Sequence, residues 1–168
     1  ALTPVDLLRR AGVETRLVGV TGETVCGARG IRVVTDLPMD DIDLAQADMI
    51  VLPGGMPGTT NLYADKRVTS AVRAMYEAGK WVAAICAAPT VLAELGLLEG
   101  RRATCYPGME DGMEGAEAVP ATCVTDGKII TACGVGGALD FACALITALI
   151  SREKADEIAF SVVYHAAN

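Results

Sequence analysis

The chain has 168 residues, of which 52% are hydrophobic and 21% are charged, so it can bury a core and is too apolar to be disordered. The formal net charge is -7, and the 14 basic residues are scattered among 21 acidic ones. Because nucleic-acid surfaces need clustered basic side chains, we expect no nucleic-acid partner. These values predict a single domain over residues 1–168.

The longest apolar stretch covers residues 129–150, but the glycine-rich segment 134–137 interrupts it and Asp140 falls near its centre. We therefore interpret it as strand, turn and helix, and expect no membrane segment. The six cysteines form no C-x-x-C pair, and the single histidine is His165 near the C-terminus. These features predict a reducing, cytoplasmic setting and no metal site.

The first predicted element is a helix that starts almost at residue 1, with Thr3 as its N-cap, Pro4 at its first position and Gly12 at its end. Strand-like runs follow at residues 14–20 and 31–34. In an α/β fold a strand feeds such a helix. We therefore expect that the chain is processed or truncated and lacks a short N-terminal strand and loop.

Two continuous apolar runs, residues 49–52 and 81–85, predict strands that are buried on both faces. Between them, residues 66–78 carry apolar side chains at helical spacing, and Gly79 closes that helix. A further helix is predicted to open at Ala87. The alternation of strands and helices predicts a mostly parallel sheet with helices on both faces.

The C-terminal third of the chain predicts a hairpin followed by two helices. The dipeptide Asp126-Gly127 is a strong hairpin signal, and Ser151 can cap the last helix. In chain order we expect a strand over 102–106, hairpin strands over 122–125 and 128–132, a helix over 138–150, and a last helix with Ala155, Ile158, Ala159, Val162 and Val163 on one face.

The residue best suited to chemistry is Cys86, which lies between the predicted strand 81–85 and the helix after it. Ala84 and Ala88 flank it at two-residue spacing, as the sharp turn of a nucleophile elbow requires. Free N–H groups and the dipole of a helix N-terminus would favour its thiolate form. The alternative is a small buried apolar residue. That description fits the other five cysteines better: Cys123, Cys133 and Cys143 lie in apolar patterns, whereas Cys26 and Cys105 lie nearer loops and are candidate secondary oxidation sites.

Two glycine-rich loops end predicted strands. Gly54 and Gly55 follow the strand 49–52, where backbone N–H groups can approach a carbonyl oxygen and, with the Ala87 N–H, form an oxyanion hole. An ordinary strand-terminal turn is the alternative. The loop at residues 134–137 lacks both a P-loop lysine and a dinucleotide fingerprint, which favours a packing turn over a phosphate site.

Three segments together carry a family resemblance: Val-Leu-Pro-Gly-Gly at 51–55, Ala-Ala-Ile-Cys-Ala-Ala-Pro at 83–89, and Thr-Ala-Cys-Gly at 131–134. They resemble the ThiJ/PfpI superfamily, in its Parkinsonism-associated deglycase branch, and the resemblance covers essentially the whole chain. It implies a flavodoxin-like three-layer sandwich, a homodimer and an oxidation-sensitive cysteine at Cys86.

The resemblance also implies what surrounds Cys86. It places a glutamate immediately before Ala1, outside the chain, and it puts Tyr106 where several members have a histidine. Tyrosine is a poor general base near neutral pH, which disfavours a Cys–His protease or amidase. The alternative for Tyr106 is that it only covers the core, with its hydroxyl in water. Arg10 and Arg29 match positions near the pocket, and the alternative is that they are surface residues with no specific role. The expected pocket is lined by Gly54, Tyr106, Gly134, Arg10 and Arg29, beside an oxyanion hole of Gly55 and Ala87.

The activity that the resemblance implies is that of a cofactor-independent glyoxalase, which converts a small 2-oxoaldehyde such as methylglyoxal to a 2-hydroxy acid. The Cys86 thiolate would attack the aldehyde carbon. The alternative is a redox-responsive chaperone or oxidative-stress sensor, in which peroxide oxidises the same thiol to sulfenic and then sulfinic acid.

Overall fold

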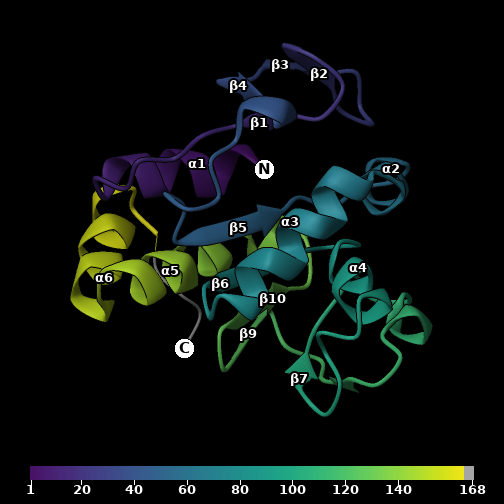
Figure 1. The fold of residues 1–168 in the computed structure, drawn as a ribbon. Helices are drawn as coiled ribbons and strands as arrows, with labels where there is room; N and C mark the ends of the chain where they lie inside the picture. Colours follow the sequence, from purple (N-terminus) through teal and green to yellow (C-terminus); the bar gives the residue numbers. More distant parts are fainter. Residues whose placement is uncertain (165–168) are drawn as a thin grey trace.

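The structure is a computed structural model, and it describes residues 1–164 (Figure 1). His165 lies outside the described residues. The α-helices are α1 (Leu2–Arg10), α2 (Gly58–Ala64), α3 (Lys66–Glu77), α4 (Pro89–Glu94), α5 (Ala138–Leu149) and α6 (Arg152–Ser161). The strands are β1 (Val18–Gly19), β2 (Thr24–Cys26), β3 (Arg32–Val34), β4 (Leu37–Pro38), β5 (Met49–Leu52), β6 (Trp81–Ile85), β7 (Arg102–Ala103), β8 (Glu117–Ala118), β9 (Cys123–Asp126) and β10 (Ile129–Ala132).

Four strands form the central sheet, in the order β5-β6-β10-β9. β6 runs parallel to β5 and to β10, and β9 returns antiparallel as the hairpin partner of β10. The hairpin predicted at Asp126-Gly127 is confirmed, and Gly127 has the positive φ, 58°, that such a turn requires. The prediction of a mostly parallel sheet is confirmed as well.

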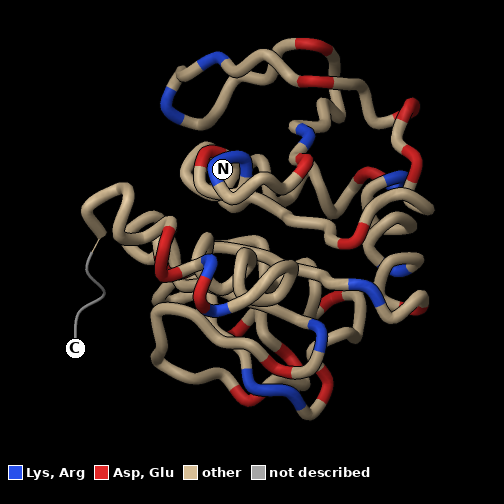
Figure 2. Tube along the Cα trace, turned by 90° about the vertical axis from the view of Figure 1, so that its left-hand side faces the viewer, with Lys and Arg blue, Asp and Glu red and all other residues tan. Residues whose placement is uncertain are grey.

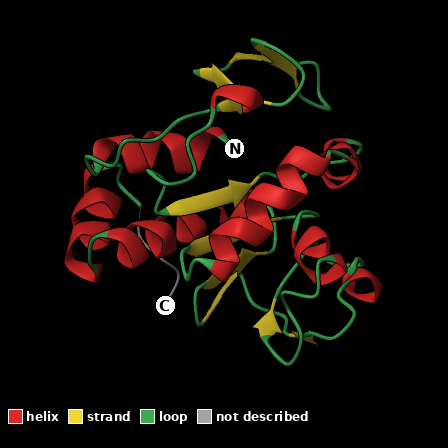
Figure 3. Cartoon of the chain, in the orientation of Figure 1, coloured by secondary structure: helices red, strands yellow, loops and turns green. Residues whose placement is uncertain are grey.

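Helices cover both faces of this sheet, so the molecule has three layers (Figure 3). Side chains alternate along β6: Val82 and Ala84 enter the core under α3 and α4, whereas Ala83 and Ile85 enter the core under α1, α5 and α6. All four are buried. This double burial explains why the strand reads as a continuous apolar run.

Several short strands lie outside the central sheet. β1 pairs with β4, β2 with β3, and β7 with β8, each as a separate two-stranded unit. The predicted strand over 14–20 is therefore reduced to Val18–Gly19, and that over 102–106 to Arg102–Ala103, because extended backbone counts as a strand only where a partner pairs with it. The sequence analysis missed α2 and three of the short strands, β2, β4 and β8.

The start of α1 differs from the predicted capping, whereas the end of α1 and the start of α6 follow it. α1 begins at Leu2, so Thr3 is not the cap and Pro4 is the third helical residue, not the first. Ala1 caps the helix without a side-chain bond. Gly12 ends it with a φ of 84°. Ser151 caps α6 as predicted, since its hydroxyl accepts a hydrogen bond from the Lys154 N–H at 3.2 Å.

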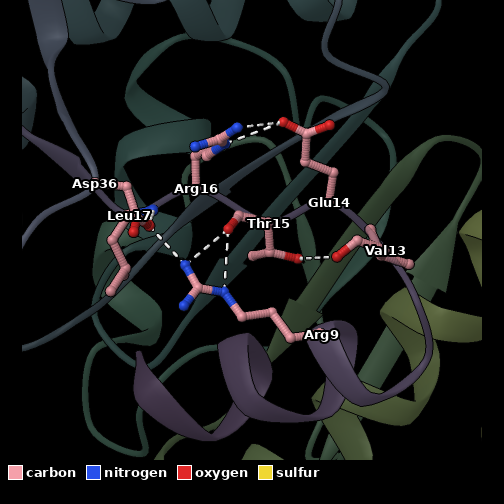
Figure 4. Close-up of polar contacts among 7 residues, drawn as sticks. All are labelled: Arg9, Val13, Glu14, Thr15, Arg16, Leu17 and Asp36. Atoms are coloured by element: carbon pink, nitrogen blue, oxygen red, sulfur yellow. Dashed lines mark hydrogen bonds and ion pairs between the residues drawn. The ribbon is translucent and has the colours of Figure 1, made fainter.

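Two arginines attach the β1–β4 unit to the rest of the molecule. From α1, Arg9 donates to the Asp36 carboxylate at 2.6 Å and to the Thr15 carbonyl at 2.9 Å (Figure 4). From α3, Arg67 donates to the Val20 carbonyl at 3.0 Å. The unit is thereby tied to both helical layers.

Basic and acidic residues, blue and red, are scattered along the tube in Figure 2. Within residues 1–164, no helix is both long and apolar enough to cross a membrane.

Candidate active site

Cys86 lies in a turn between β6, which ends at Ile85, and α4, which begins at Pro89. The helix thus starts two residues later than predicted, and residues 86–88 form the turn. Cys86 has a φ of 67°, a value that residues with a side chain rarely adopt. Its N–H donates to the Ala132 carbonyl at 2.8 Å, and its carbonyl accepts from the Tyr106 N–H at 2.8 Å. Neighbouring segments on two sides therefore hold the strained turn.

Gly54 contacts this turn directly from the end of β5. A Cβ atom at Gly54 would lie 2.6 Å from the Cys86 Cβ and 2.4 Å from the Ile85 carbonyl oxygen. No side chain fits at such distances. Glycine is therefore required here so that the backbones of two neighbouring strand ends can approach each other.

Two backbone N–H groups near Cys86 have no hydrogen-bond partner in the part of the chain that the structure describes. Among residues 1–164, neither the Gly55 N–H nor the Ala87 N–H donates a hydrogen bond within the protein. Gly55 has a φ of 98°, which glycine adopts without strain. Such unpaired donors beside a thiol are the components from which oxyanion holes are built.

Thr59 fixes the Gly55 loop, and the sequence analysis missed it because α2 was not predicted. Its backbone N–H and its hydroxyl both donate to the Gly55 carbonyl, at 2.9 and 3.2 Å. Thr59 is buried, so these bonds are shielded from water. The available signal was Pro57-Gly58 directly before it, a pair that marks a turn into a helix.

Tyr106 lies beside the elbow through its backbone and over Gly134 through its ring. A Cβ at Gly134 would be 3.6 Å from the Tyr106 Cδ2. The Tyr106 side chain is 51% exposed, and within residues 1–164 its hydroxyl makes no hydrogen bond. The structure therefore brings Cys86, Tyr106 and Gly134 together, with the phenol open to solvent.

The start of α1 also lies near Cys86. Burial lowers the pKa of the Ala1 amino group, and attraction to the Cys86 thiolate partly opposes that effect. The beginning of the chain is therefore within electrostatic range of the Cys86 thiol.

Two arginines that were expected to line the pocket, Arg10 and Arg29, make no polar contact with the Cys86 turn within residues 1–164. Arg10 forms an exposed ion pair with Asp6 on α1, with a distance of 2.9 Å. Arg29 is in the exposed turn of the β2–β3 hairpin. Neither arginine makes a hydrogen bond or ion pair to the elbow within the described part of the chain.

All six cysteines are free, and burial raises the pKa of three of them. Burial, with a smaller contribution from Glu110, raises the pKa of Cys105 to about 11. Burial and Asp140 raise the pKa of Cys123 to about 12, and the same two causes raise the pKa of Cys143. Across residues 1–164, no group of His, Cys, Asp or Glu side chains is arranged to hold a metal ion.

Comparison with known proteins gives one family. The sequence profile of the DJ-1/PfpI family matches residues 1–148. DJ-1 homolog B of Arabidopsis thaliana is 37% identical over 166 residues, which is 97% of this chain and 38% of that protein. The chain spans about two fifths of the length of the plant relatives that it matches.

Two further relatives have names that state an activity. A deglycase of Pyrococcus horikoshii is 36% identical over 131 residues, or 76% of this chain and 78% of that protein. A glutathione-independent glyoxalase of Caenorhabditis elegans is 31% identical over 155 residues, or 91% of this chain and 82% of that protein.

Solved structures agree with the fold. Drosophila melanogaster DJ-1beta matches with a TM-score of 0.92 at 33% identity, over 98% of this chain and 90% of that one. Oxidized Toxoplasma gondii DJ-1 also matches with a TM-score of 0.92, at 34% identity over 97% of this chain and 90% of that one. The flavodoxin-like sandwich that the sequence predicts is thereby confirmed.

Proposed function

The chain belongs to the DJ-1/PfpI family, and on that basis we propose that it is a cofactor-independent glyoxalase-type enzyme that acts on small 2-oxoaldehydes through Cys86. Relatives named as a deglycase and as a glyoxalase support an enzyme of small carbonyl compounds. The observation that carries the proposal is the strained Cys86 turn, with the unpaired N–H groups of Gly55 and Ala87 beside it.

The proposed reaction starts when the Cys86 thiolate attacks the aldehyde carbon of the substrate and forms a C–S bond. The carbonyl electron pair moves to oxygen, and the Gly55 and Ala87 N–H groups stabilise the resulting alkoxide. A base then moves the proton of that carbon to the neighbouring keto carbon, and the keto oxygen takes a proton from water. The alkoxide electron pair re-forms a C=O bond, which yields a 2-hydroxy thioester. Water cleaves the thioester, releases the 2-hydroxy acid and restores the thiol.

We further propose that the base belongs to the segment that precedes Ala1, as the family resemblance implies for a glutamate. The interaction between the Ala1 amino group and Cys86 supports this location, because the preceding residue would lie at the same turn. Tyr106 is open to solvent and would donate a hydrogen bond to the substrate rather than act as the base.

The test is lactate formation from methylglyoxal by the full-length gene product. We expect Cys86→Ala to reduce the rate by at least about a hundredfold, because covalent attack is lost. Cys26→Ala is the matched control, since that thiol is exposed on the β2–β3 hairpin, and it should leave the rate unchanged. Equal rates for wild type and Cys86→Ala would reject the mechanism.

The second candidate function is redox sensing through the same thiol. It is favoured by the burial that raises the pKa of Cys105, Cys123 and Cys143, since peroxide reacts with thiolates. Peptide mass spectrometry after mild peroxide treatment should find Cys86 oxidised before these three. Uniform oxidation of all six cysteines would count against it.

A further inference from the structure

Two threonines hold the carbonyl groups of Gly55 and Ala87 in the same way. Thr59 donates to the Gly55 carbonyl through its N–H at 2.9 Å and its hydroxyl at 3.2 Å. Thr90 donates to the Ala87 carbonyl through its N–H at 3.2 Å and its hydroxyl at 2.8 Å. Both acceptors are residues whose own N–H donates no hydrogen bond within residues 1–164. In each, two donors fix the carbonyl while the N–H stays unpaired.

The bond itself is ordinary, and its position is what differs. Threonine hydroxyls in helices commonly donate to a carbonyl three or four residues earlier. Thr69 and Thr147 form such bonds, at 3.3 and 2.8 Å. Their acceptors lie at the start of α3 and within α5. The acceptors of Thr59 and Thr90 instead precede α2 and α4 and adjoin the Cys86 turn.

Gly54 brings the two unpaired N–H groups next to each other. A Cβ atom at Gly54 would lie 2.9 Å from the Ala87 nitrogen, so the backbone of Gly54 touches the Ala87 N–H. The Gly55 N–H belongs to the peptide that starts at Gly54. Gly55 has a φ of 98° and no side chain, so the bonds that its neighbours make to it fix its conformation.

Packing fixes the direction of both threonine hydroxyls. Thr59 is buried. A Cβ atom at Gly112 would lie 3.0 Å from the Thr90 Cγ2, so the methyl group of Thr90 lies against the backbone of the 110–112 segment. Because a β-branched side chain has few rotamers, this contact keeps the Thr90 hydroxyl on the Ala87 carbonyl.

We propose that Thr59 and Thr90 are positioning residues of the oxyanion hole, and that their hydroxyls hold Gly55 and Ala87 so that both N–H groups face the oxygen of a substrate carbon bonded to Cys86. The inference rests on the proposed function, because the hole acts only when that oxygen becomes negatively charged. Donors that are fixed in advance stabilise such a charge better than donors that must first reorient. Loss of either hydroxyl therefore slows the reaction step and leaves substrate binding unchanged.

Methylglyoxal turnover by the full-length gene product tests the two hydroxyls. Thr90→Val removes the hydroxyl and nearly keeps the shape of the side chain, and we expect it to lower kcat at least about tenfold with KM unchanged. Thr90→Ser restores the hydroxyl and should recover most of the wild-type kcat. Thr59→Val and Thr59→Ser should behave in the same way. Thr69→Val and Thr147→Val remove the same kind of bond elsewhere and should leave kcat unchanged.

Alkylation of Cys86 by iodoacetamide separates the hole from the thiol. Displacement of iodide forms no alkoxide, so it does not use the hole, and both valine variants should be alkylated at the wild-type rate. Alkylation that falls in parallel with kcat, or a wild-type kcat in Thr90→Val, would overturn the proposal. If Thr59→Val labels the buried Cys105 as fast as Cys86, that variant is unfolded, and the partly exposed Thr90 decides the proposal alone.

Cys86→Ala in the same assay distinguishes this inference from the proposed function. Wild-type turnover in Cys86→Ala would reject the proposed function, and the role of the two threonines with it. An inactive Cys86→Ala beside a Thr90→Val variant of wild-type activity would overturn the role of the threonines alone.

Discussion

At the scale of single residues, the turn at Cys86 depends on a glycine, Gly54, that packs against it. Gly54 has no Cβ, and one at that position would overlap the Cys86 Cβ and the Ile85 carbonyl. We expect Gly54→Ala to displace Cys86 and reduce activity by about a hundredfold, since small displacements of a reacting group have effects of that size. A methylglyoxal assay beside circular dichroism would measure it.

Gly58→Ala is the control for that substitution. Gly58 begins α2 four residues later, and a Cβ there has no atom within 4 Å. Its activity should match that of the wild type. If Gly54→Ala were as active as Gly58→Ala, the close approach of the two strand ends would have no role in the activity.

Burial also lowers the reactivity of some of the cysteine thiols, because it raises their pKa. Only the thiolate is alkylated, and a pKa of about 11 leaves Cys105 about one part in a thousand ionised at pH 8. We expect iodoacetamide to label Cys86 and the exposed Cys26 first, with labelling of Cys105 rising about tenfold per pH unit up to pH 11. Peptide mass spectrometry over this range would check it. Labelling of Cys105 that is fast at pH 8 would contradict its burial.

At the scale of secondary-structure elements, the ionised carboxylate of Asp65 stabilises the start of α3. Asp65 caps the helix by accepting from the Arg67 N–H at 2.9 Å, and hydrogen bonding to the Arg67 side chain lowers its pKa from 3.8 to about 2. Because the folded pKa lies below the unfolded one, the ionised form stabilises the fold above about pH 4, and this contribution disappears as the pH falls towards 2.

Asp65→Asn tests this assignment, because asparagine still caps a helix but carries no charge. We expect the variant to be less stable than the wild type at pH 7, with the difference shrinking to near zero at pH 2. Urea unfolding at several pH values would measure it. Added salt should reduce the difference, since the Asp65–Arg67 pair is partly exposed. A difference that does not change with pH would assign the effect to the cap alone.

At the scale of the whole molecule, exposed apolar side chains gather on the β2–β3 hairpin. Ile31 is 64% exposed and Val34 is 73% exposed. The family resemblance implies a homodimer, and we expect a second copy to cover these side chains. Light scattering coupled to size exclusion should give twice the 17.4 kDa mass of the 168-residue chain, and Ile31→Asp should shift it towards the monomer.

Phe160→Asp is the control for the dimer. Phe160 is 78% exposed on α6, and Figure 1 shows that α6 lies away from the β2–β3 hairpin. Its replacement should leave the mass unchanged. A wild-type protein that is monomeric at micromolar concentration would refute the expected assembly.

The sequence by itself determined the features that depend on neighbours along the chain. Small residues at positions 84 and 88 with Pro89 after them predict a strand, a tight turn and a helix at Cys86, and the continuous apolar runs predict β5 and β6. Steric limits of a turn and the periodicity of burial act over a few residues, so a single segment contains the signal.

Only the tertiary structure decided which distant segments meet. It brought Gly54 against Cys86, the Tyr106 N–H onto the Cys86 carbonyl, and Thr59 onto Gly55. Among residues 1–164 it left one edge of β5 without a strand partner. It also left Arg10 and Arg29 without a polar contact to the elbow in the described part of the chain. Strand order and close backbone approach depend on packing between segments tens of residues apart, and no local pattern specifies that packing.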